Sequence, residues 1–273
     1  MHASAEPYLA LLLRLCAAGV LIQTLELLWH RHELQDGRLL GRNGEAPAQT
    51  TLGRWAGALV GYRGCVSALT ARALLAGACL GIGYATTTAF VLIGLLVLAQ
   101  IFYNRRFVTL AGNCDTIFLV CLVAAWAGAL PGSDGGLGKS ALIFAACHAS
   151  LAYFAAGLHK LRSGLWRSGW RLHQIAKYGS YRLPAFALGA LARPRTARWT
   201  SRAVIALELA LGLTVLLPPA IAWPLLVAGF AFHTLVAVTM GLHGFWWAFA
   251  AAYPAMVYVN RLMHHNGAWT LGP

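Results

Sequence analysis

The stretch Ala73–Asn104, ALLAGACLGIGYATTTAFVLIGLLVLAQIFYN, decides the fold, because its 32 residues include no Asp, Glu, Lys, Arg or His. A helix that crosses a bilayer needs about 20 mostly apolar residues. The stretch is therefore too long for one such helix and slightly short for two. Extending it back to about Gly64 makes two spans, and we expect the chain to turn near Gly81, Gly83 and Tyr84.

The composition of the whole chain also favours a membrane protein. Hydrophobic residues make up 59% of the 273 residues and charged residues only 11%, whereas roughly 25% are charged in ordinary soluble domains. A soluble domain of this size cannot hide so many apolar side chains, so a soluble enzyme, a disordered chain and a disulfide scaffold are excluded. The six cysteines form no Cys-x-x-Cys pair, and no cluster has the spacing of a metal site.

Apolar runs on either side of this stretch predict the remaining spans. Tyr8–Trp29 contains Arg14 and Glu26, which a cleaved signal peptide would not carry, so we expect a retained first span. The prediction is an all-α, polytopic helical bundle with seven or eight transmembrane helices, in a single domain over residues 1–273. The other spans are Asp115 to about Leu130, Ser140–Leu161, and three between Ala203 and Asn260, divided at Pro218-Pro219, Pro224, Gly241 and Gly244.

The segment Arg162–Arg202 is basic, with nine Lys or Arg residues and interleaved Trp and Tyr. This pattern is typical of a segment at the membrane surface, with its rings at the interface and its bases towards lipid headgroups. The net charge of +13 is concentrated in such blocks between apolar runs. We therefore expect membrane lipids as partners, and no nucleic acid.

The distribution of Lys and Arg predicts the orientation of the spans. With the N-terminus outside, four inner loops hold 16 of these residues, whereas the outer loops and the tail hold two. Because basic residues accumulate in cytoplasmic loops, we expect both termini outside and Lys160 near the cytoplasmic face. The four inner loops are His30–Gly64, Asn104–Val108, Arg162–Arg202 and the turn at Gly241.

Several ionisable side chains fall inside the predicted spans, where a functional role is the first hypothesis. The alternative for Arg14 is a structural ion pair with Glu208 or Asp115. We expect Glu208 and His233 to face the bundle interior and to have polar partners, because burying a lone ion is costly. The set is Arg14, Glu26, Asp115, His148, His159, Lys160, Glu208, His233 and His243.

The span Ser140–Leu161 carries the most informative pattern. His148 and His159 lie 11 residues apart, which is about 20° beyond three turns, so they share one helix face. Ala152 and Ala155 lie between them and leave room for a neighbouring helix or a flat ligand. The adjacent face holds Tyr153, Ala156, Gly157 and Lys160.

Lys160 has two interpretations, an interfacial anchor or, if it points into the bundle, a desolvated general base. The stretch Tyr153–Leu161, YFAAGLHKL, followed by Trp166 and Gly169, resembles the pattern Tyr-Phe-x-Ala-Gly-x-x-Lys-Leu…Trp…Gly. That pattern belongs to the membrane part of vitamin K-dependent γ-carboxylase and its bacterial relatives, the HTTM family (horizontally transferred transmembrane domain). Weaker similarities occur at Gly112-Asn113-Cys114-Asp115, Glu208, His233, Met240-Gly241-Leu242 and Phe245.

The resemblance implies a membrane enzyme of the bacterial inner membrane. In the carboxylase, the lysine that corresponds to Lys160 deprotonates vitamin K hydroquinone. The resemblance therefore implies a reduced quinone as cofactor, a peptide or protein as candidate substrate, and a catalytic role for Lys160 with His159 beside it. The ligand-binding residues are then Tyr153, Gly157, Asp115, His148, Glu208 and His233.

Three departures from the carboxylase argue against peptide carboxylation itself. The luminal domain that holds the protein substrate has no counterpart here, Asp115-Thr116 replace an Asn-His pair, and His159 replaces a second lysine. The carboxylase also places its lysine on the luminal side, whereas the distribution of Lys and Arg predicts the cytoplasmic side for Lys160. The leading hypothesis is an enzyme that acts on a quinol-like or other apolar ligand. The alternatives are a non-enzymatic accessory protein for peptide maturation or export, and a transporter.

Overall fold

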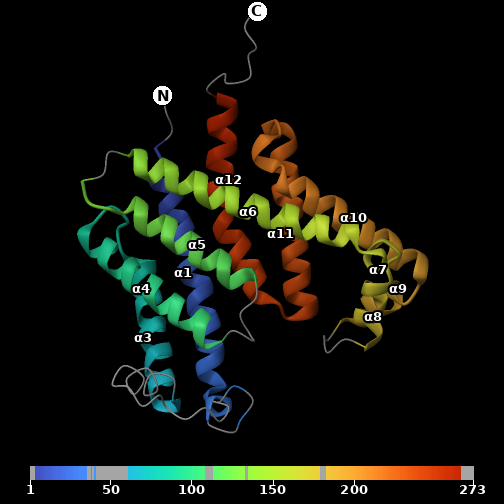
Figure 1. Ribbon diagram of the computed structural model, residues 1–273, viewed down its shortest axis with the longest axis horizontal. Coiled ribbons are helices and arrows are strands. Elements are labelled where there is room, and N and C mark those ends of the chain that lie inside the picture. Colours follow the sequence, from blue (N-terminus) through green and yellow to red (C-terminus); the bar gives the residue numbers. More distant parts are fainter. Residues whose placement is uncertain are drawn as a thin grey trace, which may run out of the picture. The chain divides into compact units, whose positions relative to one another are not determined.

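The computed structural model describes residues 4–35, 38, 40, 61–107, 113–132, 135–178 and 183–265, and all regular structure in these ranges is helical (Figure 1). This confirms the all-α prediction. Five of the described helices have the length and composition to cross a membrane, which indicates a membrane protein, but seven or eight spans are not confirmed. The five are α1 (Glu6–Trp29), α3 (Tyr62–Gly81), α4 (Thr87–Arg106), α6 (Gly136–Arg162) and α11 (Pro219–Met240).

The other helices are shorter or more polar. The apolar helix α5 (Asn113–Gly128) has 16 residues, fewer than the roughly 20 that a straight crossing needs. The remaining elements are α7 (Gly164–Arg167), α8 (Trp170–Tyr178), α9 (Ala185–Leu191), α10 (Pro194–Gly212) and α12 (His243–His265), with the 3₁₀ turns η1 (Arg31–Leu34) and η2 (Thr214–Leu216).

Local sequence signals explain several helix ends. The turn between α3 and α4 falls at residues 82–86, close to the predicted position, and Thr86 caps α4 by accepting a hydrogen bond from the Ala89 N–H at 3.1 Å. Gly241 ends α11 in the left-handed conformation, with φ of +71°, which glycine adopts without strain. Pro224 was expected to mark a division between spans, but it lies inside α11. It falls in the second turn, where its missing N–H removes only one hydrogen bond.

Helix α10 crosses the boundary predicted at Ala203. It begins at Pro194, a residue suited to the first helical position. Part of the basic segment and part of the following apolar run therefore form one amphipathic helix instead of two elements. Its buried face recurs at helical spacing through Ala197, Ser201, Ile205, Glu208 and Leu211.

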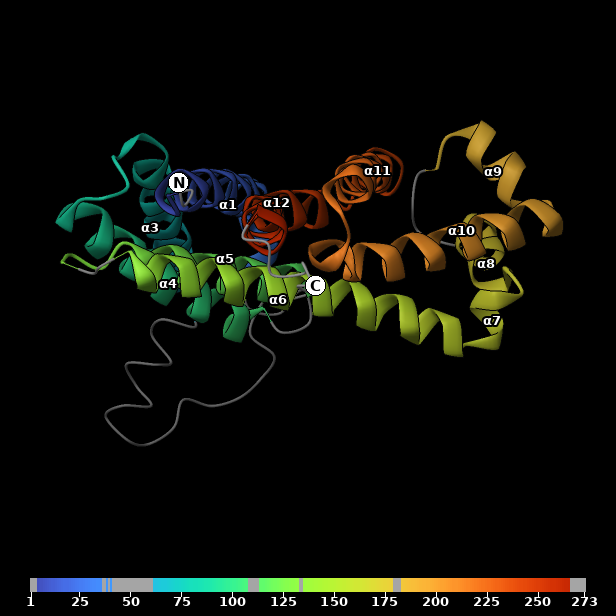
Figure 2. The ribbon, with the colours of Figure 1, turned by 90° about the horizontal axis from the view of Figure 1, so that it is seen from above.

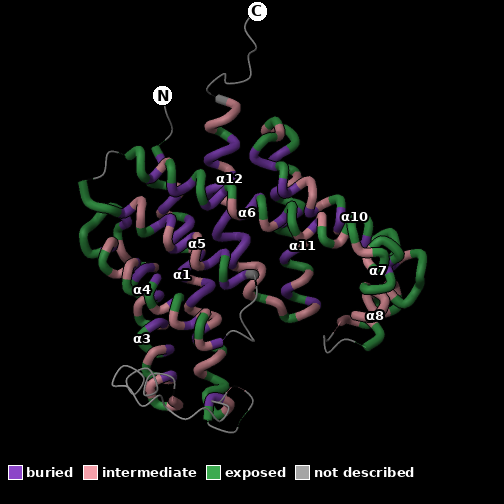
Figure 3. Tube along the Cα trace, in the orientation of Figure 1, coloured by how far each residue is buried: buried purple, intermediate pink, exposed green. Residues whose placement is uncertain are grey.

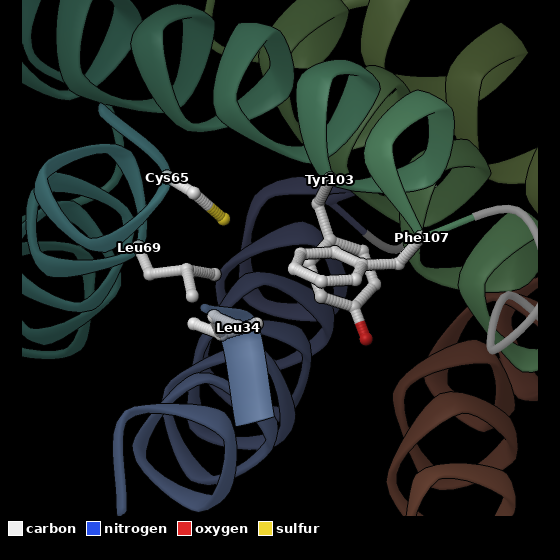
Figure 4. Packing of buried hydrophobic residues seen from close by; sticks show 5 residues of the cluster. All are labelled: Leu34, Cys65, Leu69, Tyr103 and Phe107. Atoms are coloured by element: carbon white, nitrogen blue, oxygen red, sulfur yellow. The ribbon is translucent and has the colours of Figure 1, made fainter. Parts of the chain in front are cut away.

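The described helices group into two compact units, Leu9–Ala141 (the N-terminal unit) and Met1–Tyr8 with Leu142–Pro273 (the C-terminal unit). In the N-terminal unit, α4 packs against both α3 and α5. A buried cluster joins η1, the start of α3 and the end of α4 (Figure 4). These three helix ends therefore lie together. The predicted orientation places the two loops next to these ends, His30–Gly64 and Asn104–Val108, on the same side of the membrane. The cluster consists of Leu34, Cys65, Leu69, Tyr103 and Phe107.

In the C-terminal unit, α11 and α12 form a hairpin around Gly241, and η2 packs on α12. The Asn260 side chain of α12 donates hydrogen bonds to the carbonyls of Thr214 at 3.0 Å and Leu217 at 2.7 Å. Residues 142–162 of α6 lie beside α10, and α10 packs against α11 (Figures 1 and 2). Helices α7 and α8 pack on α10, and much of their outer surface is exposed (Figure 3).

Candidate functional site

An ion pair joins α6 and α10 in the C-terminal unit. The Lys160 ammonium donates hydrogen bonds to both carboxylate oxygens of Glu208, each at 2.7 Å. The two side chains are largely buried, with 19% and 9% of their surface exposed, and the ammonium lies 5.3 Å from the centre of the Trp166 ring. The expected polar partner of Glu208 is therefore present, but it is Lys160. Arg14 is exposed on α1 in the N-terminal unit, and its pairing with Glu208 or Asp115 stays a prediction.

Two glycines allow α6 and α10 to approach closely. A Cβ atom on Gly157 would lie 3.0 Å from the backbone nitrogen of Leu209, and one on Gly212 would lie 2.8 Å from the backbone nitrogen of Phe154. The distance at Gly212 is shorter than close packing allows and the distance at Gly157 is at its limit, so a larger residue at either position would require the helices to shift apart. Gly157 precedes Lys160 by about one turn, so the same close approach sets the geometry of the ion pair.

A second polar group, the tyrosine cluster, consists of Tyr153, His233, Tyr253 and Phe249. The Tyr153 hydroxyl forms hydrogen bonds with His233 Nε2 at 2.8 Å and with the Tyr253 hydroxyl at 3.1 Å. The His233 ring stacks on Phe249 with the ring centres 4.4 Å apart. Tyr153 and His233 are both buried, which confirms that His233 faces the interior with a polar partner. The cluster connects α6, α11 and α12.

The tyrosine cluster and the ion pair lie along one face of α6. Tyr153 and Lys160 are seven residues apart, which is within about 20° of two full turns and about 10 Å along the helix axis. Lys160 interacts electrostatically with His233, and Glu208 with Tyr153. The C-terminal unit thus holds an ammonium–carboxylate pair and hydrogen-bonding rings between largely apolar helices. Such a set brings together groups that can donate and accept protons.

The face of α6 that carries His148 and His159 is not the packed face. His159 and Ala155 are exposed, and His148 and Ala152 are half-buried. Of the two predicted occupants of the space at Ala152 and Ala155, no described helix packs closely on the exposed Ala155, and the close contact falls at Gly157 on the adjacent face. A flat ligand at this face stays a prediction. The catalytic role of His159 and the ligand-binding role of His148 stay predictions.

Asp115 belongs to the N-terminal unit and is part of a separate polar network. Its Oδ1 accepts a hydrogen bond from Gln23 Nε2 at 2.7 Å, and Gln23 Oε1 accepts one from Arg72 Nη2 at 2.8 Å. One amide side chain therefore connects a cation to an anion. Gly112, part of the weaker similarity around Asp115, lies outside the described residues.

Arg72 is the centre of this network and is only 1% exposed. Its guanidinium also donates to Gln100 Oε1 at 2.6 Å and to Thr24 Oγ1, and it lies 4.0 Å from the centre of the Tyr103 ring. A buried cation needs a counter-charge, and Asp115 supplies one through Gln23. The sequence alone did not point to Arg72 as a site residue. The acceptors of its hydrogen bonds are neutral side chains on α1 and α4, so no complementary charge pattern reveals them.

The described residues contain no group of three His, Cys, Asp or Glu side chains that could hold a metal ion. The chain matches no protein-family model, no curated protein and no solved structure. Its function is therefore inferred from the geometry of the ion pair and the tyrosine cluster.

Proposed function

We propose that this chain is an integral protein of the bacterial plasma membrane, related to the HTTM family, that binds a quinol-like apolar ligand in its C-terminal unit and acts on it as an enzyme. The observation that carries the proposal is the largely buried Lys160–Glu208 ion pair beside the tyrosine cluster. Ionisable groups between apolar helices are costly and occur mainly at ligand and proton sites. A peptide or protein substrate, as the resemblance implies, stays a prediction.

The ion pair has the composition of an acid–base couple. Transfer of one proton from Lys160 to Glu208 converts the ammonium and the carboxylate into a neutral amine and a carboxylic acid. Surroundings of low dielectric reduce the free-energy difference between these two forms, because they penalise separated charges. The free amine then accepts a proton from a hydroxyl group of the bound ligand, and the ammonium is restored. A reduced quinone supplies such a hydroxyl group when it is bound.

The tyrosine cluster suits the ring of such a ligand. The hydroxyls of Tyr153 and Tyr253 and the Nε2 atom of His233 offer hydrogen bonds to ligand oxygens, and Phe249 offers an aromatic face. The parallel packing of His233 on Phe249 is the arrangement that a flat ring adopts against an aromatic side chain. In this proposal the cluster orients the ligand, and Lys160 exchanges the proton.

The Lys160→Arg variant is expected to bind the ligand normally and to lose about a hundredfold or more in turnover. Arginine keeps the charge and both hydrogen bonds to Glu208, but guanidinium hardly deprotonates, and a general base contributes roughly 10²–10⁴-fold. The measurement is the oxygen-dependent oxidation of a naphthohydroquinone by the purified chain in lipid nanodiscs. Lys139→Arg, near the other end of α6, is the matched control and should keep the full rate. Oxidation by Lys160→Arg at the wild-type rate would rule out the base role.

A non-enzymatic accessory protein for peptide maturation or export is the second candidate. It is favoured by the fact that both Glu208 oxygens already accept hydrogen bonds from Lys160. This is also the geometry of a structural lock between α6 and α10. If the pair is only a lock, the Lys160→Arg variant keeps it and retains the full cellular function, and the wild-type chain does not bind a hydroquinone.

A further inference from the structure

The outer face of α10 carries a stripe of three exposed arginines. Arg195, Arg198 and Arg202 follow one another at spacings of three and four residues, which places them on the same side of the helix. Trp199 is exposed next to them, and the Arg202 guanidinium lies 5.4 Å from the centre of its ring. The buried face of α10 is centred about 110° around the helix axis from the stripe, so the stripe flanks the packed face and remains exposed.

No acidic side chain of the neighbouring sequence neutralises this stripe. Residues 162–207 contain nine Lys or Arg and no Asp or Glu. The ion pairs found within the described part of the chain, His32–Glu33 and Lys160–Glu208, involve none of the three arginines. Helix α8 packs on α10 and adds exposed bases and rings of its own. These are Trp170, Arg171, Lys177 and Tyr178.

The stripe is held on a rigid support. Gly169, with φ of +80°, lies so close to α10 that an added Cβ would come within 2.4 Å of the Arg198 backbone nitrogen. The Ser201 hydroxyl donates a hydrogen bond to the Trp166 carbonyl at 2.6 Å. The arginines therefore project from a backbone that is fixed by packing. Binding of a ligand would then cost little backbone conformational entropy.

We propose that this arginine stripe binds the phosphate groups of anionic phospholipids at the membrane surface. Arginine recognises phosphate oxygens through paired hydrogen bonds, and exposed Trp rings prefer the headgroup level. The second half of α10 is apolar and packs on α6 and α11, so the helix leads from a basic surface towards the apolar helices. This continuity favours a lipid over a soluble polyanion such as nucleic acid. The inference does not depend on the function proposed for Lys160.

The test uses the full chain in nanodiscs of phosphatidylcholine that contain increasing amounts of brominated phosphatidylglycerol, which quenches nearby tryptophans. The difference between the wild type and Trp199→Phe isolates the signal of Trp199. Bromine on phosphatidylglycerol should quench Trp199 more strongly than bromine on phosphatidylcholine. The combined change Arg195→Gln, Arg198→Gln and Arg202→Gln should abolish that preference. The affinity of the site for phosphatidylglycerol should fall by about fivefold for each arginine that is replaced.

The matched control neutralises three exposed arginines of the N-terminal unit, Arg31→Gln, Arg63→Gln and Arg105→Gln. It should keep the preference at Trp199, and circular dichroism should show that both triple variants retain their helices. Equal quenching by the two lipids in the wild type would overturn the proposal. So would an equal loss in the control, which would indicate a diffuse charge effect. Protection of Trp199 by a random oligonucleotide, without preference for phosphatidylglycerol, would assign the stripe to nucleic acid instead.

Discussion

Replacement of Arg72 by methionine is expected to lower the free energy of unfolding by about 3–5 kcal/mol, the typical cost of removing one partner from a buried charge network. The change leaves Gln23 and Gln100 without their donor and leaves the Asp115 carboxylate without its linked cation. Chemical denaturation in detergent micelles, followed by circular dichroism, measures the effect.

Asp115→Asn is the informative second change. If Asp115 is the counter-charge of Arg72, the Arg72→Met/Asp115→Asn double variant should be more stable than the sum of the two single losses predicts, by at least about 1 kcal/mol. Arg14→Met, an arginine on the exposed side of α1, is the matched control and should hardly change stability. Strictly additive losses would show that the two charges are independent.

The double variant Gly157→Val/Gly212→Val is expected to separate α6 from α10 and to destabilise the C-terminal unit by about 2–6 kcal/mol, because each overpacked site typically costs 1–3 kcal/mol. The new side chains would collide with backbone atoms of Leu209 and Phe154, which cannot move without shifting a helix. The Lys160–Glu208 pair, about one turn away, should break at the same time. Denaturation measures the loss.

Gly77 and Gly189 provide the control for this experiment, because an added Cβ at either position meets nothing within 4 Å. The Gly77→Val/Gly189→Val variant should be at least as stable as the wild type, since valine has a higher helix propensity than glycine. Equal losses in the two double variants would mean that the glycine contact between α6 and α10 is not what fixes these helices.

The positions of the helices could be predicted from the sequence because lipid-compatible helices need long apolar runs. The run 73–104 gave α3 and α4 with the turn between them, and Tyr8–Trp29 closely matches α1. The number of spans is harder to predict. Helix α5 is short, and α10 carries a basic first half, so neither meets the length and composition of a span.

The partners inside the structure could not be predicted, because helices that are apolar on all sides do not reveal which face packs. His148 and His159 share a face, yet the close contact of α6 lies on the face of Gly157. Arg14 looked like a candidate for pairing and is exposed. The Lys160–Glu208 pair connects residues 48 positions apart and depends on where two glycines let the helices meet. Tyr253 and Phe249 were also missed, although their spacing of four residues places them on one face of a helix.

The most direct test of the central claim, that Lys160 and Glu208 exchange a proton with a bound apolar ligand, is the oxygen-dependent oxidation of a naphthohydroquinone by the charge-swapped chain. The double change Lys160→Glu/Glu208→Lys restores the ion pair between α6 and α10 but moves the amine to the other helix. The swapped chain should be more stable than either single variant, yet oxidise the hydroquinone at least about tenfold more slowly than the wild type. Oxidation at the wild-type rate by the swapped chain would contradict the claim and leave the pair as a structural lock.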